Sequence, residues 1–277
     1  MSSSSKSSEV SFKITFSKIS DVKPHEEIID KNLHELVSSI KKDGVQIDPV
    51  VVDESSGVAL DGMHRIAALK ALDAKRIMVA KVDYLDERIK VQRWLRAVKD
   101  FSSSLLDELK VALQLRKALD AQEAMKLVDS EKSPLAIIIN GASYYSSASV
   151  SGLFEKFSLI KEFDRRVREF KSILDGELAS YVSSGYMVLY VKKPEKEEVI
   201  KAGTSGTLFP PKSTRHIIPY RPVNVRCPLE LLTSKYSDAE AAAALSAILD
   251  KAKKTVLPPR SVYAGRVYEE ELVLFNP

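Results

Sequence analysis

The stretch Val58–Leu72, VALDGMHRIAALKAL, passes from an apolar run through Asp61-Gly62 into a helical pattern. A strand that ends in Asp-Gly and turns directly into a helix aims the first backbone N–H groups of that helix at one spot, where the helix dipole favours an anion. Gly62 permits the tight turn and the close approach of a ligand, while Arg65 offers a planar fork of donors for phosphate oxygens. His64 can donate to the same anion, and Asp61 would face a metal ion or a substrate hydroxyl. The stretch therefore predicts a phosphate site at residues 61–65, which we name the phosphate cradle.

The same residues also have a purely structural interpretation. Asp61 would cap the helix through its side chain, and His64 and Arg65 would lie on a solvated helix face. Because so short a motif often matches by chance, the other polar clusters of the chain have to decide between the two interpretations.

The composition is typical of a globular protein, with 277 residues, 44% hydrophobic and 29% charged. No apolar run is long enough to span a bilayer, and the serine-rich start, MSSSSKSSEV, lacks the apolar region of a signal peptide. We expect a disordered lead-in over residues 1–10 and a cytoplasmic protein with no membrane partner. The net charge of +4 suits an anionic ligand but is too small to indicate nucleic acid. A single cysteine, Cys227, excludes an intrachain disulfide and a thiolate zinc cluster.

Hydrophobic periodicity and turn residues predict an α+β chain with short strands and amphipathic helices. A helix is expected to start with Asp30 as its N-cap and to end at Gly44. The other expected strands are 12–16, two within 48–62, 76–86, 133–141, 186–193 and a last one near the C-terminus. A second helix is expected to start at residue 63. Further helices are expected over 86–100, 154–174, 194–203 and the alanine-rich stretch 237–254, with one or two more within 104–129. Residues 203–222 are expected to form a proline-punctuated loop.

The cluster Pro24-His25-Glu26-Glu27 follows the first expected strand. Acidic residues before a helix act as a capping device that stabilises by ~0.3–1 kcal/mol, which is the structural interpretation. A loop carboxylate near a phosphate site could instead accept the proton of a hydroxyl nucleophile. Glu26 is the candidate for that base.

A second cluster, Lys212–His216, lies between Pro210-Pro211 and Pro219, so we expect a stiffened loop. A surface loop would have the same composition. Thr214, Arg215 and His216 nevertheless match what a small zwitterion needs, namely a hydroxyl, a fork for a carboxylate and a switchable donor. Trp94, on the helix expected at 86–100, fits a core position better than a ligand wall.

Together these clusters resemble the archaeal free L-serine kinases, through KPHEE, DGMHR, VDYLDE, Trp94 and PPKSTRHIIPYRP in that order. The resemblance runs from about residue 14 to residue 232 and is densest over 25–96 and 210–222. It implies a ParB/sulfiredoxin-like N-terminal fold and the transfer of a phosphoryl group from ATP or ADP to free L-serine. It also implies Mg²⁺ or another divalent cation. The product, O-phospho-L-serine, would enter cysteine synthesis.

The resemblance also implies a set of site residues. Glu26 would be the base, and Asp61, the acidic residue of the motif, would also be important for activity. The phosphates would lie at Gly62, Met63, His64 and Arg65, and the serine pocket at Trp94, Thr214, Arg215 and His216. No residue is assigned as a metal ligand. The chain departs from the family at Met63, where the kinases have histidine, and in the tail beyond Thr233, which the family core lacks.

The expected domains are the lead-in 1–10, a ParB/sulfiredoxin-like nucleotide-binding domain at 11–102, a second mixed α/β domain at 103–235 that completes the substrate pocket, and a helical C-terminal extension at 236–277. The oligomeric state is left open.

Three other functions compete with the serine kinase. A sulfiredoxin needs a cysteine where this chain has Met63, so we discount it. A ParB-like DNA-binding protein would use the cradle for a nucleotide switch, but residues 104–172 hold no convincing helix-turn-helix signature. A kinase of L-threonine or another small hydroxy amino acid would differ only by a methyl group in the pocket, and the donor could be ATP, ADP or pyrophosphate.

Overall fold

The computed structural model describes residues 11–276, which form two compact units. Unit 1 comprises residues 11–90, 199–208 and 216–276, and unit 2 comprises residues 91–198 and 209–215. This division differs from the expected ranges, because it begins unit 2 at residue 91 and joins the C-terminal segment to unit 1. The expected lead-in 1–10 lies outside the described residues. No helix within residues 11–276 is long and apolar enough to cross a membrane.

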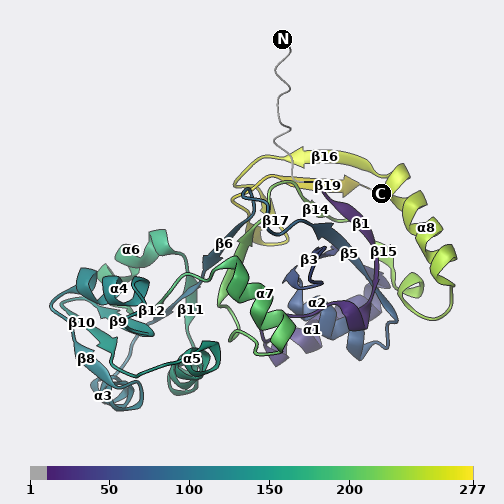
Figure 1. Ribbon diagram of the computed structural model, residues 1–277. Helices are drawn as coiled ribbons and strands as arrows, with labels where there is room; N and C mark the ends of the chain where they lie inside the picture. The colour runs from purple at the N-terminus through teal and green to yellow at the C-terminus, as the bar shows by residue number, and fades with distance from the viewer. Residues whose placement is uncertain (1–10, 277) are drawn as a thin grey trace, which may run out of the picture. The chain divides into compact units, whose positions relative to one another are not determined.

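Unit 1 is built on a four-stranded sheet in the order β1-β5-β3-β4, in which β3 runs parallel to β5 and the other pairs are antiparallel. All four residues of β3, VVVD, are buried, as is usual for an apolar run in a parallel pair. Helices α1 and α2 pack together below this sheet in Figure 1. The bounds are β1 (Lys13–Lys18), α1 (Asp30–Asp43), β2 (Val45–Gln46), β3 (Val50–Asp53), β4 (Ala59–Asp61), α2 (Met63–Ala71) and β5 (Arg76–Val82).

The C-terminal end of α1 confirms the expected cap residue, and the N-terminal end corrects it. Gly44 is the C-cap in the left-handed region, with φ 67°, as the sequence predicts. The N-cap is Ile29 instead of Asp30, which is the first residue of the helix, and no side chain caps this end.

The C-terminal segment is part of the core of unit 1. Leu245 and Phe275 belong to the same buried cluster as Ile66 and Ile77 of the central elements. Strand β19 pairs in parallel with β14 and in antiparallel with β16. The bounds are β14 (Arg221–Val223), β15 (Cys227–Pro228), α8 (Asp238–Lys251), β16 (Lys253–Leu257), β17 (Val262–Tyr263), β18 (Arg266–Val267) and β19 (Leu272–Asn276). The expected alanine-rich helix and last strand are therefore confirmed as α8 and β19.

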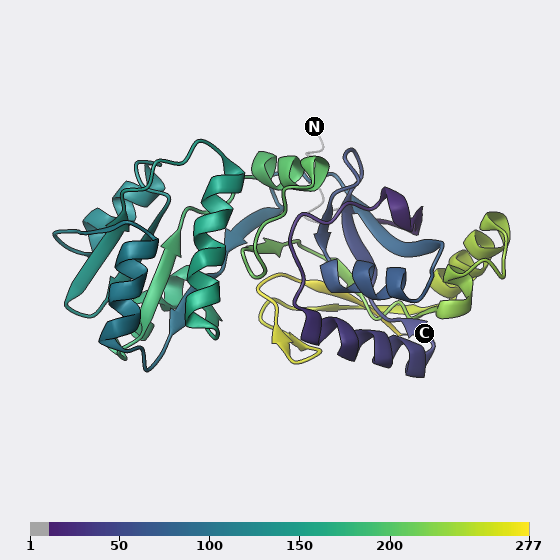
Figure 2. The same cartoon turned by 90° about the horizontal axis from the view of Figure 1, so that it is seen from below.

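Unit 2 is a six-stranded antiparallel sheet in the order β11-β7-β12-β9-β10-β8, with helices on both faces. Figure 1 shows α4 and α6 on one face and α3 and α5 on the other, and Figure 2 shows α3 and α5 side by side. The bounds are β6 (Lys90–Arg93), β7 (Leu95–Val98), α3 (Ser103–Ala112), β8 (Leu115–Lys117), α4 (Ala121–Asp129), β9 (Leu135–Ile139), β10 (Ala142–Ser146), α5 (Leu153–Val167), β11 (Lys171–Ile173), α6 (Leu178–Ser183) and β12 (Met187–Val191). Helix α7 (Lys196–Ser205) and strand β13 (Thr214–Ile217) complete the fold.

The helix expected over residues 86–100 is wrong, because β6 and β7 occupy most of this segment. Two of its three arginines, which imitate the polar face of an amphipathic helix, are buried: Arg93 is 7% exposed and Arg96 is 1% exposed. Trp94 lies between the two strands and is half-buried. Strand β11 likewise replaces the end of the helix expected at 154–174, and β13 replaces part of the loop expected at 203–222.

Candidate active site

The phosphate cradle of unit 1 has the predicted strand–turn–helix geometry. Strand β4 ends at Asp61 and α2 begins at Met63, so Gly62 alone forms the turn, with φ 104° and ψ 28°. A Cβ atom at this position would lie 2.9 Å from Cγ2 of Val50 and 3.0 Å from Nε of Arg65. Glycine is therefore required both by the backbone angle and by the space. Gly62 is itself the N-cap and α2 has no side-chain cap, so the interpretation of Asp61 as a helix cap is wrong.

Asp61 lies between two arginines. Its Oδ2 atom is 2.5 Å from Nη2 of Arg65 and 3.3 Å from Nη1 of Arg221. Burial by itself would raise the pKa of Asp61, but the charges of Arg65, Arg221 and Arg266 outweigh it and hold that pKa well below its ordinary value. Asp61 is therefore ionised at neutral pH.

Arg65 is not on a solvated helix face, because its side chain is only 16% exposed. Its Nη1 atom also lies 3.6 Å from Oδ2 of Asp48. Held between two carboxylates and folded over Gly62, its guanidinium stays at the N-terminus of α2, where a phosphate is expected.

The loop that carries Glu26 is hydrogen-bonded to the cradle elements on both sides of that residue. Nδ1 of His25 donates to the carbonyl of Ala59 at 2.5 Å, and the N–H of Ile29 donates to Nε2 of His64 at 3.0 Å. Because Nε2 of His64 accepts, a neutral His64 carries its proton on Nδ1 and can donate it to an anion. The loop is thus fixed to β4 and to the first turn of α2.

His25 is buried, and burial lowers its pKa even though the charges of Glu26 and Asp61 and the Ala59 carbonyl act to raise it. The His25 ring also packs edge-on against His216 with 5.4 Å between the ring centres, and His216 is hydrogen-bonded through Nε2 to the hydroxyl of Tyr84 at 2.9 Å. The structure thus places His216 in unit 1 with the cradle residues.

Trp94, Thr214 and Arg215 belong to unit 2. The guanidinium of Arg215 lies over the Trp94 ring, 5.1 Å from its centre, and the backbone N–H of Trp94 donates to the carbonyl of Ser213 at 3.2 Å. The preceding loop is fixed by Arg96, whose Nη2 donates to the carbonyl of Pro211 at 2.9 Å and whose Nε donates to Asp164 at 2.6 Å. Hydrogen bonds anchor the start of the expected loop, whereas Thr214–Ile217 form strand β13, and Arg215 presents a cation on an aromatic face.

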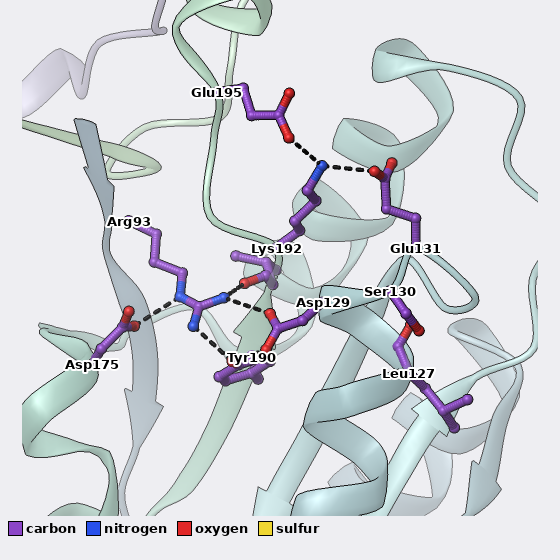
Figure 3. Close-up of polar contacts among 10 residues, drawn as sticks. Arg93, Leu127, Asp129, Ser130, Glu131, Asp175, Tyr190, Lys192 and Glu195 are labelled. Carbon is purple, nitrogen blue, oxygen red and sulfur yellow. Dashed lines mark hydrogen bonds and ion pairs between the residues drawn. The ribbon is translucent and has the colours of Figure 1, made fainter. Parts of the chain in front are cut away.

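An ion network around the buried guanidinium of Arg93 holds the strand next to Trp94 (Figure 3). Nε of Arg93 donates to Asp175 at 2.7 Å, Nη2 donates to the hydroxyl of Tyr190 at 2.7 Å, and Nη1 donates to the carbonyl of Val191. Tyr190 in turn donates to Asp129 at 2.8 Å. Because the guanidinium bonds the backbone of β12, it fixes the end of β6 and so the position of the tryptophan that follows.

The chain resembles known proteins in both sequence and fold. The family model of the ParB N-terminal domain matches residues 1–97. The ATP-dependent L-serine kinase of Staphylothermus marinus is 30% identical over 224 residues, which are 76% of this chain and 87% of that protein. This chain belongs to the free L-serine kinase family. The ADP-dependent L-serine kinase of Thermococcus kodakarensis is 28% identical over 229 residues, covering 78% of this chain and 92% of that protein.

A solved structure of a free serine kinase, in a variant with one glutamate replaced by alanine and in complex with ADP, has the same fold. The TM-score is 0.68 at 26% identity, and the match covers 81% of this chain and 95% of that one. Together with the ParB N-terminal match, this similarity confirms the expected α+β fold and the family resemblance.

Compared with the residues predicted for this kinase family, the site contains additional charged residues. Arg221 and Asp48 were not singled out, although Arg221 belongs to the quoted motif PPKSTRHIIPYRP and Asp48 precedes β3. A charged residue at the edge of an apolar strand is the local signal that could have found both. Met63, predicted at the phosphates, directs its side chain into the core cluster, which leaves its backbone N–H for a ligand.

The described part of this chain offers few ligands to a divalent cation. Within residues 11–276 no group of three or more His, Cys, Asp or Glu side chains could hold a metal ion. Mg²⁺ in phosphotransferases usually binds one or two carboxylates together with substrate phosphates and water. Asp61 and Asp48, on either side of Arg65, fit that limited role.

Proposed function

We propose that this protein is a phosphotransferase that moves a phosphoryl group from ATP or ADP to the hydroxyl of free L-serine. The observation that carries the proposal is the double attachment of the Glu26 loop to the cradle, through His25 to Ala59 and through Ile29 to His64. This attachment supports Glu26 as a base close to the phosphate cradle. Membership of the L-serine kinase family supports the same reaction.

The nucleotide phosphates would bind at the N-terminus of α2. The backbone N–H groups that start the helix, Nδ1–H of His64 and the fork of Arg65 supply donors, and the helix dipole adds positive potential. Phosphoryl transfer depends on positioning and charge stabilisation more than on covalent catalysis, so this set is sufficient. Mg²⁺, held mainly by the phosphates with Asp61 or Asp48, would neutralise charge on the transferred group.

Glu26 would act as the general base. In the transfer, a bond forms between Oγ of serine and the terminal phosphorus, the bond from that phosphorus to the bridging oxygen of the nucleotide breaks, and the serine proton passes to Glu26. A free serine kinase with one glutamate replaced by alanine is in complex with ADP, which supports the expectation that a kinase of this family can lose a carboxylate and still bind nucleotide.

Trp94, Thr214 and Arg215 would bind the amino acid, with Arg215 pairing with its carboxylate. The product, O-phospho-L-serine, would supply cysteine biosynthesis. A kinase of L-threonine stays the second candidate, since a pocket discriminates against one methyl group by only ~1–3 kcal/mol.

The test is direct. The pure protein is incubated with Mg²⁺ and L-serine or L-threonine, and with ATP, ADP or pyrophosphate in turn, and the product is identified by mass spectrometry. We expect O-phospho-L-serine with ATP or ADP. A protein that forms no phosphorylated amino acid under any of these conditions contradicts the proposal.

A further inference from the structure

The C-terminal segment reaches the cradle through a short hairpin. Strands β17 and β18 pair in antiparallel register through Tyr263 and Arg266, and Ala264 and Gly265 form the turn with φ 47° and 74°. The N–H of Arg260 donates to the carbonyl of Tyr268 at 2.7 Å and closes the base of the hairpin. Residues 260–270 therefore have a defined conformation within unit 1.

The first contact of this hairpin is with Asp48. The hydroxyl of Tyr263 donates to Oδ1 of Asp48 at 2.9 Å, and the N–H of Asn224 donates to the same oxygen at 2.8 Å. The other carboxylate oxygen of Asp48 faces Arg65. Tyr263 thus orients a carboxylate that in turn holds the phosphate-binding arginine.

The second contact is between Glu270 and Arg221. Nη2 of Arg221 donates to Oε1 of Glu270 at 2.9 Å, and the two side chains are 3% and 1% exposed. Nε and Nη1 of Arg221 are buried and have no hydrogen-bond acceptor in the described part of the chain, although Nη1 lies 3.3 Å from Asp61. A buried guanidinium with unfilled donors next to the cradle is costly unless a ligand accepts from it.

The third contact adds another cation. The guanidinium groups of Arg221 and Arg266 both lie over the Tyr268 ring, 5.5 Å and 4.7 Å from its centre. Through the shared Tyr268 ring, Arg266 of the C-terminal hairpin is therefore close to Arg221, whose Nη1 lies 3.3 Å from Asp61.

We propose that Arg266 binds a phosphate group of the nucleotide in the cradle. Glu270 positions Arg221 for the same polyanion, and Tyr263 positions Arg65 for it through Asp48. A nucleotide triphosphate or diphosphate carries several negative charges, and guanidinium forks pair with phosphate oxygens in a bidentate manner. The C-terminal segment is then a working part of the nucleotide site. The inference deepens the proposed function and rests on it.

Arg266→Ala in the full-length protein tests the inference, with ATP and ADP as the titrated ligands in calorimetry. Losing a charge-assisted hydrogen bond to phosphate should weaken binding of both by about tenfold. The KM for nucleotide should rise in parallel while the KM for L-serine stays unchanged. Arg266→Lys should recover part of the affinity, because it keeps the charge and loses the fork. Lys253→Ala removes an exposed positive charge from the same segment and is the matched control, expected to bind like the wild type.

Tyr263→Phe and Glu270→Gln test the positioning residues. Each should raise the KM for nucleotide several-fold without changing the KM for L-serine. A merely structural role would lower the thermal midpoint and leave the nucleotide KM unchanged, and that result would overturn the positioning claim. If the wild type binds nucleotide and phosphorylates serine but Arg266→Ala binds ATP and ADP as tightly as the wild type, the inference for Arg266 fails. A wild type that neither binds nucleotide nor phosphorylates serine contradicts the proposed function itself.

Discussion

The guanidinium of Arg65 lies directly over Gly62, so that a Cβ atom on the glycine would be 3.0 Å from both Nε and Nη2 of the arginine. The turn residue and the phosphate-binding residue are therefore coupled in space as well as in sequence. Any side chain at position 62 has to displace Arg65 from the N-terminus of α2.

Gly62→Ala should weaken ATP and ADP binding by at least tenfold, because it moves Arg65 and strains a residue at φ 104°. Calorimetric titration with each nucleotide measures the effect. Gly44→Ala is the matched control, since Gly44 also has positive φ, 67°, but nothing lies within 4 Å of its added Cβ. Equal nucleotide affinity in the two variants would show that the residue at position 62 does not control Arg65, and it would contradict the phosphate cradle.

Glu26→Gln should lower kcat by about 10²–10⁴-fold, the usual contribution of a general base, while nucleotide affinity stays within twofold of the wild type. The amide keeps the shape of the side chain but cannot accept the serine proton at neutral pH. Glu27→Gln, one residue further along the same loop, is the control and should retain its turnover. A kcat close to the wild-type value in Glu26→Gln would remove this residue as the base.

Arg215→Lys should raise the KM for L-serine by about tenfold and leave nucleotide binding unchanged, because lysine cannot reproduce a bidentate pair with a carboxylate. Steady-state kinetics with serine varied at saturating nucleotide measures this. Arg116→Lys, at an exposed arginine of β8, serves as the control for an arginine-to-lysine change in the same unit. An unaltered serine KM would place the amino acid elsewhere.

The sequence predicts the cradle because its signals are local. An Asp-Gly pair after an apolar run and a helical pattern after it define the turn within five residues, and the structure has that turn. The same reasoning fails for strands β6 and β7. Arg93 and Arg96 are buried in ion pairs with acids far along the chain, so in the sequence these two arginines imitate the polar face of a helix. Hydrophobic periodicity assumes that charged residues are exposed, and these two are not.

The C-terminal contribution to the site could not be predicted for a related reason. Tyr263 and Asp48 are 215 positions apart, and no local pattern links them. The sequence of the tail predicts a helix and a last strand but not the hairpin of β17 and β18, nor where the tail packs. Its place in the core of unit 1 depends on contacts such as those of Leu245 and Phe275 with elements from the first third of the chain.

The buried His25 should make the protein less stable in mild acid. Its pKa in the folded state is below the ordinary value, because burial disfavours the charged imidazole. As pH falls below the ordinary histidine value of about 6.5, the unfolded chain binds a proton that the folded chain refuses, so the free energy of unfolding decreases. One such group contributes at most about 1.4 kcal/mol per pH unit.

Urea unfolding of wild type and His25→Asn between pH 7 and pH 5 measures this effect. Asparagine can still donate to the Ala59 carbonyl but cannot titrate, so the variant should lose less stability over this interval than the wild type. His34→Asn, at an exposed histidine of α1, is the matched control for a histidine-to-asparagine change. If the free energy of unfolding falls equally with pH in His25→Asn and in the wild type, His25 is not the group that makes the folded state sensitive to acid.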